Sequence, residues 1–450
     1  MQLPKEFKER MHSMLGEDWD AFEKAFCEGE NHSAIRINTL KKDAHNAIAK
    51  AFELGENVPW CSDGYYVQKE KISGNHPYHM GGLFYFQEPS AMAPAAALPI
   101  DEGDMVLDLC GAPGGKSTHL AAKLGGSGML VANEIVRKRA QILSQNIERM
   151  GIKNAIVTSE SPQKLSERFP LFFDKIMVDA PCSGEGMFRK EPQAITEWSI
   201  EHTLSCAARQ KNILDSAAEM LKGGGMLAYS TCTFAPCENE EICAYMVKHH
   251  GFEMVEITLP ALTDGRNDWC ESDTDVSASK RLFPHIQKGE GHFLALFRKP
   301  LTENEGHKTP KYTPPKDAIK LYRDFEKENL NITLDGYFAA FGEKLYLLPE
   351  NIDIDKLSVL RAGLELGECK KMRFEPSHAL ALALAKEDFK NHIELDADSG
   401  DIQKYLSGNV IPTDKKGWCV VTVDGYGIGW AKASGGIAKN HLPKGLRINI

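Results

Sequence analysis

The chain of 450 residues exceeds what a single hydrophobic core usually serves, so the sequence predicts two or three domains. Hydrophobic residues make up 42% and charged residues 26%, there is no run of about 18 apolar residues, and the N-terminal segment is charged throughout, which argues against a membrane or secreted protein and predicts a cytoplasmic one. The net charge is −10, so if the protein binds nucleic acid, its basic residues must be gathered on a local surface. The eleven cysteines are irregularly spaced, which argues against a disulfide framework and against a metal site.

Residues 1–95 are predicted to form a small α/β accessory region. They contain the strand-like segment SAIRINTL (33–40) and a stretch rich in Gly, Tyr and His (64–82), and they lead into FYFQEPSAMAPAAAL (84–98).

Residues 96–300 change to short apolar runs that alternate with helical segments. The predicted strands are 105–110, 128–134, 154–159, 175–180 and 225–231, and the predicted helices are 118–124, 137–150 and 209–221. Such alternation is typical of parallel strands with helices packed on both faces. The sequence therefore predicts an α/β fold with a doubly wound, mostly parallel, Rossmann-like sheet.

Three further segments follow. Residues 301–316 are rich in Pro, Lys and Thr and lack an apolar period, so they are predicted to be a linker. Residues 317–390 carry mixed helix and strand signals, and residues 391–450 are predicted to be a β-rich module with glycines at its turns. The last forty residues carry a local charge of +4, which favours contact with phosphate, although a solvated terminal domain is the alternative. The charges are Lys415, Lys416, Lys432, Lys439, Lys444 and Arg447 against Asp414 and Asp424.

A glycine-rich turn follows the first predicted strand and ends at a helix that opens near Ser117. Small residues let the backbone pass close to a ligand, and a helix N-terminus presents free N–H groups, so we expect a nucleotide-like ligand. A phosphate-binding P-loop is disfavoured because Cys110 occupies the position of its first glycine. The expected cofactor-binding residues of this turn are Cys110, Gly111, Ala112, Pro113, Gly114, Gly115 and Lys116.

Glu134 closes the second predicted strand. An acid at this position can accept hydrogen bonds from both hydroxyls of a ribose, whereas a solvated acid at a helix start is the alternative. Because the preceding turn lacks a full G-x-G-x-x-G pattern, a pyrophosphate is not required. S-adenosylmethionine, which has no pyrophosphate, therefore fits the turn and the acid together.

Two cysteines follow later strands. Asp179 ends the fourth predicted strand, Cys182 lies shortly after it in a polar, glycine-rich loop, and Cys232 follows the fifth strand. The carboxyl ends of parallel strands meet at the edge where ligands of such folds bind. We therefore expect Asp179 beside the cofactor and both thiols in one cleft, with a buried structural thiol as the alternative for Cys182.

A pair of thiols suits methyl transfer to carbon 5 of cytosine. Addition of a thiolate to carbon 6 makes carbon 5 nucleophilic, and a second acid or base helps to release the enzyme afterwards. Asp179 could hydrogen-bond N3 and the exocyclic amine and so reject uracil. The spacing of the residues does not show which cysteine attacks.

These stretches together resemble the Nol/Nop/Sun family of RNA cytosine-5 methyltransferases, and within it the bacterial enzymes that act on the rRNA of the small subunit. The resemblance covers most of the chain and implies a class I methyltransferase domain, S-adenosylmethionine as cofactor, an N-terminal RNA-recognition-type lobe and a C-terminal PUA-like module. It rests on CGAPGGK (110–116), Glu134, DAPCSGEG (179–186) and STCTF (230–234), with IRINTL (35–40) and FQEPSAM (86–92) upstream.

The resemblance also assigns roles. The cysteine of the Thr-Cys motif is the nucleophile in this family and the cysteine after proline aids release, which implies Cys232 and Cys182 respectively. It further implies 16S rRNA as the partner, within the 30S subunit or its precursor, and an enzyme that acts as a monomer and binds no membrane.

One position departs from the family pattern. Ser161 stands where the family usually has an Asp on the adenine side of the cofactor, and Glu160 could substitute for it. We also expect Arg139 to be a cofactor-binding residue. Arg137, Arg139, Arg189 and Lys190 flank the motifs and could hold substrate phosphates, although exposed basic residues are more often solvated.

Three other functions remain open from the sequence. A DNA cytosine-5 methyltransferase would use the cysteine after proline as its nucleophile. A tRNA cytosine-5 methyltransferase would share the chemistry but not the substrate. A ribosome-assembly factor would bind rRNA without catalysis, although intact Asp179, Cys182 and Cys232 argue against a decayed site.

Overall fold

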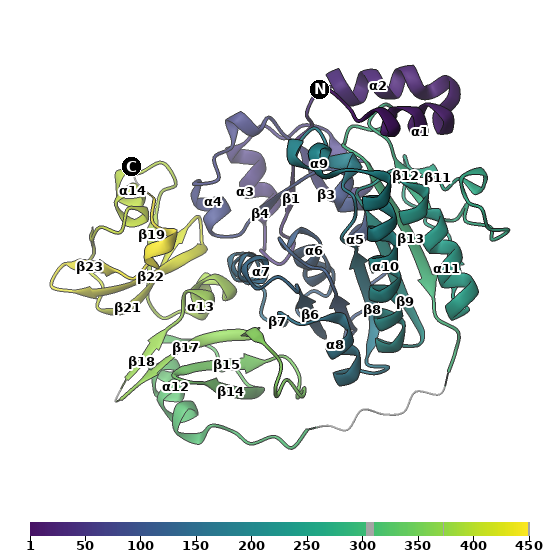
Figure 1. Ribbon diagram of the computed structural model, residues 1–450. Coiled ribbons are helices and arrows are strands. Elements are labelled where there is room, and N and C mark those ends of the chain that lie inside the picture. The colour runs from purple at the N-terminus through teal and green to yellow at the C-terminus, as the bar shows by residue number, and fades with distance from the viewer. Residues whose placement is uncertain (303–309, 372, 449–450) are drawn as a thin grey trace.

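The computed structural model describes residues 1–302, 310–371 and 373–448, and within them the chain forms four β-sheets with helices packed against them (Figure 1). Of the predicted linker, 301–316, residues 303–309 lie outside the described residues. Across the described residues, no helix is long and apolar enough to cross a membrane.

The chain begins with two antiparallel helices, α1 (Lys5–Leu15) and α2 (Trp19–Glu28). An N-terminal sheet follows, with the strand order β2-β3-β1-β4. Its strands are β1 (Ala34–Ile37), β2 (Asn57–Val58), β3 (Cys61–Tyr66) and β4 (Phe84–Gln87). The helices of this part are α3 (Ala44–Ala51), α4 (Pro77–Met80) and α5 (Ala93–Ala97), and α5 leads into the next sheet.

The central sheet has ten strands in the order β11-β12-β13-β9-β8-β5-β6-β7-β16, with β10 paired to β13. Its parallel strands are β5 (Met105–Asp108), β6 (Met129–Asn133), β7 (Ala155–Thr158), β8 (Phe173–Asp179) and β9 (Leu221–Thr231). The antiparallel strands are β10 (Glu253–Val255), β11 (Thr263–Asp264), β12 (Lys280–Leu282), β13 (His292–Arg298) and β16 (Val359–Ala362). The helices are α6 (Gly115–Lys123), α7 (Arg137–Arg149), α8 (Pro162–Arg168), α9 (Pro192–Glu197), α10 (Ile200–Met220) and α11 (Glu240–His250).

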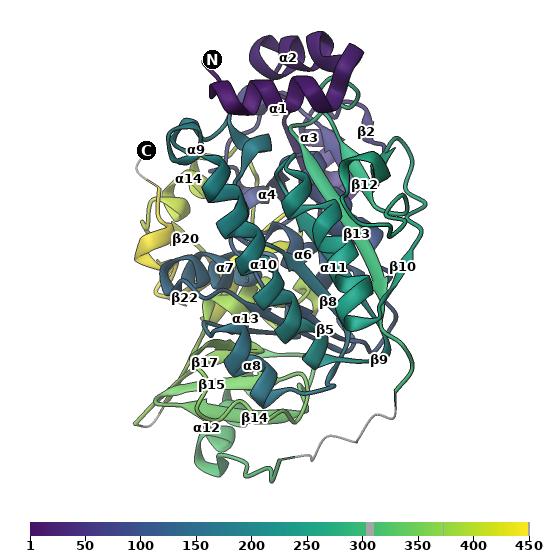
Figure 2. The same cartoon turned by 45° about the vertical axis from the view of Figure 1, so that its right-hand side comes forward.

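Both faces of the parallel strands are buried, which explains their continuous apolar runs. Neighbouring residues on β5 pack on opposite faces of the sheet. Leu107 packs with residues of α8, α10 and α11, whereas Val106 packs with residues of α5, α6 and α7. Figure 2 shows α10 and α11 covering one side of the sheet.

The predicted doubly wound sheet is confirmed, with additions at both edges. β5 pairs in parallel with both β6 and β8, so the chain winds first to one side of β5 and then to the other. Antiparallel strands from residues 253–298 extend one edge, and β16 pairs antiparallel with β7 at the opposite edge. The local pattern could not indicate β16, because its pairing joins segments that are far apart in the chain.

Two more sheets complete the fold. The third sheet has the order β14-β15-β17-β18 and packs on α12 (Lys316–Asn329); its strands are β14 (Tyr337–Phe341), β15 (Lys344–Leu348), β17 (Leu364–Lys370) and β18 (Arg373–Pro376). Helix α13 (His378–Ala383) leads to the C-terminal sheet, which has the order β19-β21-β22-β23-β20 and carries α14 (Gly400–Leu406). Its strands are β19 (His392–Leu395), β20 (Ile411–Pro412), β21 (Gly417–Val423), β22 (Tyr426–Ser434) and β23 (Ile437–Asn440).

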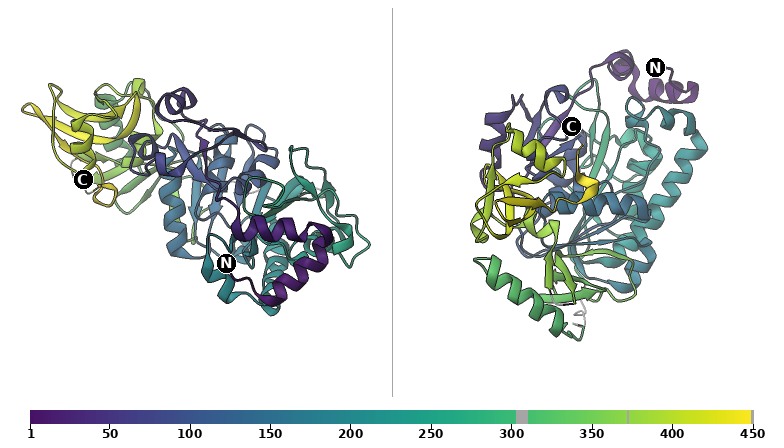
Figure 3. Two further views of the ribbon diagram at one scale, coloured as in Figure 1. Left: turned by 90° about the horizontal axis from the view of Figure 1, so that it is seen from above. Right: turned by 90° about the vertical axis from the view of Figure 1, so that its left-hand side faces the viewer.

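The C-terminal sheet packs on the N-terminal sheet, and the two share a hydrophobic cluster that includes Ile35 and Phe84 from one and Val421 and Ile428 from the other. In Figure 3 the C-terminal sheet, in yellow, lies beside the violet-blue part of the N-terminal region, whereas the darkest purple helices at the N-terminus lie apart from it. The N-terminal and C-terminal sheets, which are far apart in the sequence, are therefore held together by one apolar core.

Candidate functional site

The carboxyl ends of β5, β6, β7, β8 and β9 meet at one edge of the central sheet, where the chain reverses its winding direction at β5. Ligands of open α/β sheets bind at such a switch point. Asp108 ends β5 and Asp179 ends β8, while Glu134 and Cys232 directly follow β6 and β9. The structure thus brings the residues singled out from the sequence to one edge.

The glycine-rich turn, residues 110–116, is held by Asn133 at the end of β6. The Gly111 N–H donates to the Asn133 carbonyl oxygen (2.7 Å), and the Asn133 side-chain amide donates to the carbonyl oxygens of Leu109 (3.2 Å) and Glu160 (3.0 Å). The side-chain oxygen of Asn133 accepts from the Glu160 N–H (3.0 Å). This buried residue, which sequence reasoning missed, ties together the turns that follow β5, β6 and β7.

At two glycines of this turn the backbone carries no side chain that could block a ligand. A Cβ on Gly111 would lie 2.6 Å from Ser117 Oγ, and Gly114 has a φ of +120°, which residues with a side chain rarely adopt. The turn can therefore approach a ligand closely, as the sequence predicted.

Asp108 lies fully buried beneath the turn. Its Oδ2 accepts from Ser117 Oγ (2.6 Å), while its Oδ1 has no hydrogen-bond partner among the described residues. Burial raises the pKa of Asp108 to about 7. A buried oxygen left without a partner indicates a position where a donor of a ligand fits.

Glu134 and Arg139 form a clamp beside the turn. Arg139 Nη1 lies 3.0 Å from Glu134 Oε2, and Arg139 Nη2 donates to the Ala112 carbonyl oxygen (3.1 Å). Glu134 Oε1 accepts from the Val136 N–H (2.9 Å). Since Glu134 is buried, these contacts fix its carboxylate against the turn.

Glu160 and Ser161 follow β7, and both have partners within the chain. Glu160 Oε1 accepts from the Ser358 N–H and lies 2.8 Å from Lys164 Nζ, while Ser161 Oγ caps α8 by accepting from the Lys164 N–H (3.3 Å). The loop thus has a defined conformation, and the residue that holds it, Ser358, comes from the C-terminal part of the chain.

Asp179 lies between the turn and the cysteines. Lys116 Nζ donates to Asp179 Oδ2 (2.8 Å), and Ser230 Oγ donates to Asp179 Oδ1 (2.7 Å). Burial by itself would raise the pKa of Asp179, but the charge of Lys116 and these hydrogen bonds outweigh it and lower the pKa. Burial likewise would lower the pKa of Lys116, yet Asp179 raises it, so the pair is ionised.

The Sγ atoms of Cys182 and Cys232 lie 3.3 Å apart, within hydrogen-bond reach for two thiols. The contact with Cys232 and burial raise the pKa of Cys182 well above its ordinary value. Cys182 therefore keeps its proton at neutral pH.

A buried carboxyl group, Glu238, joins the two cysteine loops. Its Oε2 accepts from the Ser183 N–H (3.0 Å) and from Gln210 Nε2 (2.9 Å), and Ser183 Oγ hydrogen-bonds Thr233 Oγ1 (2.8 Å). Burial raises the pKa of Glu238 to about 7. Since Ser183 follows one cysteine and Thr233 follows the other, these contacts hold the two thiols together.

The N-terminal sheet supports the turn from outside. Arg36 on β1 is buried, donates to the Gly115 carbonyl oxygen (2.7 Å) and to Thr118 Oγ1 (2.7 Å), and also contacts Gln87 on β4. The upstream segments around Arg36 and Gln87 therefore act on the site by holding the start of α6.

The basic residues that flank the motifs are engaged within the chain. Arg137 donates to Ser358 Oγ (2.8 Å), Arg189 Nε donates to the buried Glu290 (2.7 Å), and Lys190 lies 3.5 Å from the same carboxylate. Their positions are explained by these contacts without a substrate phosphate.

Four family models match the chain. Residues 95–298 match 16S rRNA methyltransferase RsmB/F, residues 3–89 the N-terminal domain of 16S rRNA methyltransferase RsmF, residues 324–384 the RsmF rRNA methyltransferase first C-terminal domain, and residues 390–448 the Methyltransferase RsmF PUA domain. Ribosomal RNA small subunit methyltransferase F of Vibrio vulnificus (strain YJ016) is 33% identical over 465 residues, covering 99% of this chain and 97% of that protein. The chain belongs to the 16S rRNA methyltransferase RsmB/F family.

Further comparisons agree with membership of the RsmB/F family. Ribosomal RNA small subunit methyltransferase F of Aeromonas salmonicida (strain A449) is 33% identical, with 94% of this chain and 92% of that protein covered. A solved methyltransferase homolog protein from Pyrococcus horikoshii is 29% identical with a TM-score of 0.59 and covers 66% of this chain and 95% of that one. NSun6 from the same organism shares the fold, at 23% identity and a TM-score of 0.58, over 66% of this chain and 98% of that one.

These matches confirm the Rossmann-like methyltransferase core and the PUA domain predicted from the sequence. As a member of the RsmB/F family, the chain is an S-adenosylmethionine-dependent RNA methyltransferase.

Proposed function

We propose that this chain transfers a methyl group from S-adenosylmethionine to carbon 5 of a cytosine in 16S rRNA, through a covalent bond between Cys232 Sγ and carbon 6 of the ring. The observation that carries the proposal is the pair of thiols, Cys182 and Cys232, 3.3 Å apart beside the Lys116–Asp179 ion pair. Carbon 5 of cytosine is too weak a nucleophile without such covalent activation. Membership of the 16S rRNA methyltransferase RsmB/F family and the similarity to small subunit rRNA methyltransferases support the 16S target.

The reaction begins when the Cys232 thiolate adds to carbon 6 and the electron pair of the carbon 5–carbon 6 double bond becomes available at carbon 5. When bound, the cofactor would supply an electrophilic methyl group on a sulfonium for carbon 5, and its sulfur would leave as a neutral thioether. A base then removes the carbon-5 proton, the double bond re-forms, and the carbon–sulfur bond breaks to return the thiolate. Cys182, which keeps its proton 3.3 Å from that sulfur, stabilises the departing thiolate by hydrogen bonding.

Asp179 selects the base in this proposal. Its ionised carboxylate accepts hydrogen bonds from the exocyclic amine and from N3 when that atom is protonated in the adduct. Uracil presents the opposite pattern, because its carbonyl oxygen stands where cytosine has the amine. Lys116 and Ser230 hold the carboxylate in place.

We assign the cofactor to the cradle formed by the turn and the strand ends around it. The bare backbone at Gly111 and Gly114, the partnerless Oδ1 of Asp108 and the carboxylate of Glu134 suit a ligand with ribose hydroxyls, a positive charge and no phosphate. The residues that would hold it are Cys110, Gly111, Ala112, Pro113, Gly114, Gly115, Lys116, Glu134, Arg139 and Asp179, with Glu160 and Ser161 on the adenine side.

We further infer that the chain works as a monomer in the cytoplasm, on 16S rRNA within the 30S subunit or its precursor. Support for RNA binding outside the catalytic centre comes from the match of residues 390–448 to a PUA domain. We propose the division 1–95, 96–300, 317–390 and 391–450, with 301–316 as linker, and four family models with similar ranges support it. Strand β16 departs from it by joining the central sheet.

The two cysteines provide the test. Cys232→Ser should abolish both methylation and the covalent RNA complex, whereas Cys182→Ser should accumulate a covalent complex that resolves slowly, measured by denaturing gels with labelled RNA. An inactive Cys182→Ser variant without an adduct, alongside an active Cys232→Ser variant, would reverse the assignment.

Bisulfite mapping of rRNA from cells with and without the gene identifies the target. An unchanged map of 16S rRNA would redirect the search to tRNA.

A further inference from the structure

His292 begins β13 beside the reacting residues, and no step described above uses it. β13 runs antiparallel to β9, with Leu294 opposite Ser230. Because alternate residues of a strand share one face, the His292 side chain lies on the same face as Leu294 and Ser230, and Ser230 donates to Asp179. This places His292 Nε2 3.8 Å from Asp179 Oδ1.

The His292 side chain is only 4% exposed, and its Nε2 has no hydrogen-bond partner among the described residues. An unpaired buried polar group destabilises the folded protein, so its retention requires an explanation. The separation of 3.8 Å from Asp179 Oδ1 is too long for a hydrogen bond, but a shift of roughly 1 Å would make one.

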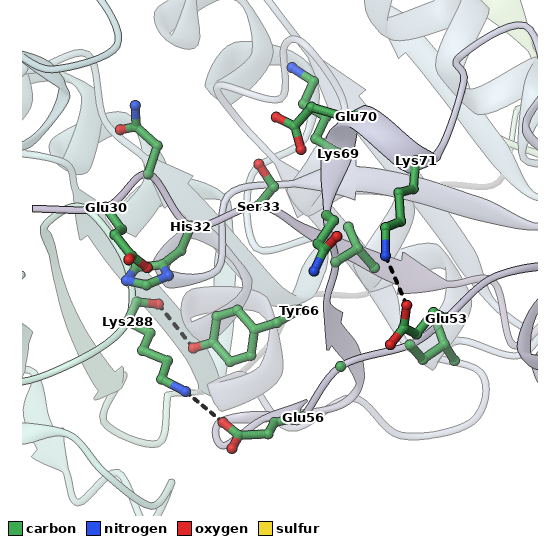
Figure 4. A pocket seen from close by; sticks show the side chains of 15 residues that line it. Glu30, His32, Ser33, Glu53, Glu56, Tyr66, Lys69, Glu70, Lys71 and Lys288 are labelled. Atoms are coloured by element: carbon green, nitrogen blue, oxygen red, sulfur yellow. Dashed lines mark hydrogen bonds and ion pairs between the residues drawn. The ribbon is translucent and has the colours of Figure 1, made fainter.

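The segment that precedes His292 is fixed by the N-terminal sheet. Tyr66 OH donates to the Lys288 carbonyl oxygen (2.9 Å), as Figure 4 shows in the pocket that these residues line. Two residues later, the Glu290 N–H donates to Glu88 Oε1 (3.0 Å). Because the start of β13 is anchored in this way, the backbone that carries the imidazole is held opposite Asp179.

Charged groups from three elements face the imidazole: Lys116 from α6, Asp179 from the end of β8, and Glu88 from the loop after β4. Burial and then Lys116 lower the pKa of His292 to about 4, so the ring is neutral at neutral pH. A neutral imidazole still carries one N–H and can present it through Nε2. Lys116 already balances the negative charge of Asp179. His292 can therefore add a directional hydrogen-bond donor to this carboxylate without adding a second positive charge.

We propose that His292 is a positioning residue for Asp179: in the substrate complex its Nε2–H donates to Asp179 Oδ1 and, with Ser230 and Lys116, aims the carboxylate at N3 and the exocyclic amine of the cytosine. Hydrogen bonds of catalytic groups are often long without ligand and tighten when substrate binds. This inference rests on the proposed role of Asp179.

The test compares His292→Leu, which removes the donor, with His292→Gln, whose amide N–H reaches a position similar to Nε2. In the full-length enzyme, His292→Leu should lower kcat by roughly 10- to 100-fold on small ribosomal subunits, with KM for RNA and Kd for S-adenosylmethionine changed by no more than about twofold. His292→Gln should restore most of kcat. Equal losses of activity and thermal stability in both variants would indicate a packing role only and would overturn the inference.

A double-mutant cycle with Asp179→Asn gives the second measurement. If His292 acts through Asp179, His292→Leu should have little further effect on kcat in the Asp179→Asn background. Independent, multiplicative effects would overturn the inference. A wild-type enzyme that forms no 5-methylcytosine would refute the proposed function together with this inference, whereas an active wild type matched by His292→Leu would refute the inference alone.

Discussion

At the scale of single residues, buried carboxyl groups hold the loops that carry Cys182 and Cys232. Glu185, in the loop of Cys182, accepts from Arg10 Nη2 (2.6 Å) and Trp198 Nε1 (2.7 Å) through Oε1, and from the Phe234 N–H (3.0 Å) through Oε2. One side chain thus joins α1, the loop after β8 and the loop after β9. Removing such a group would leave several buried donors without partners, which is costly.

Asp108 provides a prediction about pH. Because its pKa is raised to about 7 in the folded protein, it is protonated when folded and ionised when unfolded between about pH 4 and pH 7. The unfolded state then binds fewer protons, so the free energy of unfolding should fall as pH rises through this window, by up to about 4 kcal/mol. Asp108→Asn keeps an acceptor for Ser117 and should make this dependence shallower, leaving the similar contribution of Glu238, whose pKa is also raised to about 7. Urea denaturation from pH 4 to pH 8 measures the difference.

The matched control for Asp108 is Asp20→Asn at an exposed position of α2, which should leave the pH dependence as in the wild type. Parallel pH profiles for the wild type and Asp108→Asn would contradict the assignment of a buried, protonated carboxyl group at this site.

At the scale of elements, the site depends on the docking of β1 against α6. Arg36 crosses from one to the other, and its guanidinium satisfies the Gly115 carbonyl oxygen and the Thr118 hydroxyl where α6 begins. A planar group with several donors can make these contacts at once, whereas a shorter or apolar side chain cannot. The helix N-terminus that faces the cofactor cradle is therefore positioned by a strand from another sheet.

Arg36→Met should lower the free energy of unfolding by about 3–5 kcal/mol, because it leaves buried acceptors unpaired. It should also weaken S-adenosylmethionine binding by roughly tenfold or more, since the turn loses its support. Calorimetry and chemical denaturation measure the two effects. Arg373→Met, at an arginine 69% exposed, is the control and should change neither quantity; an Arg36→Met variant with wild-type affinity and stability would refute the supporting role.

At the scale of the whole molecule, the C-terminal part of the chain completes the catalytic sheet. β16 covers the edge of β7, and the Ser358 N–H that precedes it binds Glu160 in the loop of the proposed cofactor site. Elsewhere the C-terminal sheet shares its core with the N-terminal sheet, and Tyr426 OH donates to the Lys42 carbonyl oxygen (2.8 Å). The C-terminal part is thus linked to the rest of the molecule both at the edge of the central sheet and through the apolar core that it shares with the N-terminal sheet.

This arrangement predicts the behaviour of a divided chain. Residues 1–302 and 310–450, expressed together as separate polypeptides, should purify as a 1:1 complex that binds S-adenosylmethionine. Residues 1–302 alone should melt at a lower temperature and bind the cofactor more weakly, because the edge of β7 and an apolar face of the N-terminal sheet become exposed. Calorimetry on both samples checks this, and full affinity and stability in the 1–302 fragment would contradict the coupling.

Much of the site could be predicted from local patterns. The glycine-rich turn, Asp179 and the two cysteines each follow an apolar run that forms a parallel strand, and parallel strands share one carboxyl edge. Proximity of Cys182 and Cys232 followed from that rule alone. By contrast, Asn133 and His292 carried no recognisable signal, since an Asn at a strand end and a His before a Phe occur in many proteins for ordinary reasons. Arg36 lies in the segment IRINTL (35–40), but the sequence did not show that its side chain reaches the start of α6.

By itself, the sequence determined the doubly wound sheet and which residues end its strands, because apolar periodicity and glycine-rich turns act over a few neighbouring residues. Only the tertiary structure decided that Cys182 keeps its proton beside Cys232, that His292 faces Asp179 across β13 and β9, and that β16 closes the edge of β7. These features depend on burial and on pairing between distant segments, which no local pattern specifies.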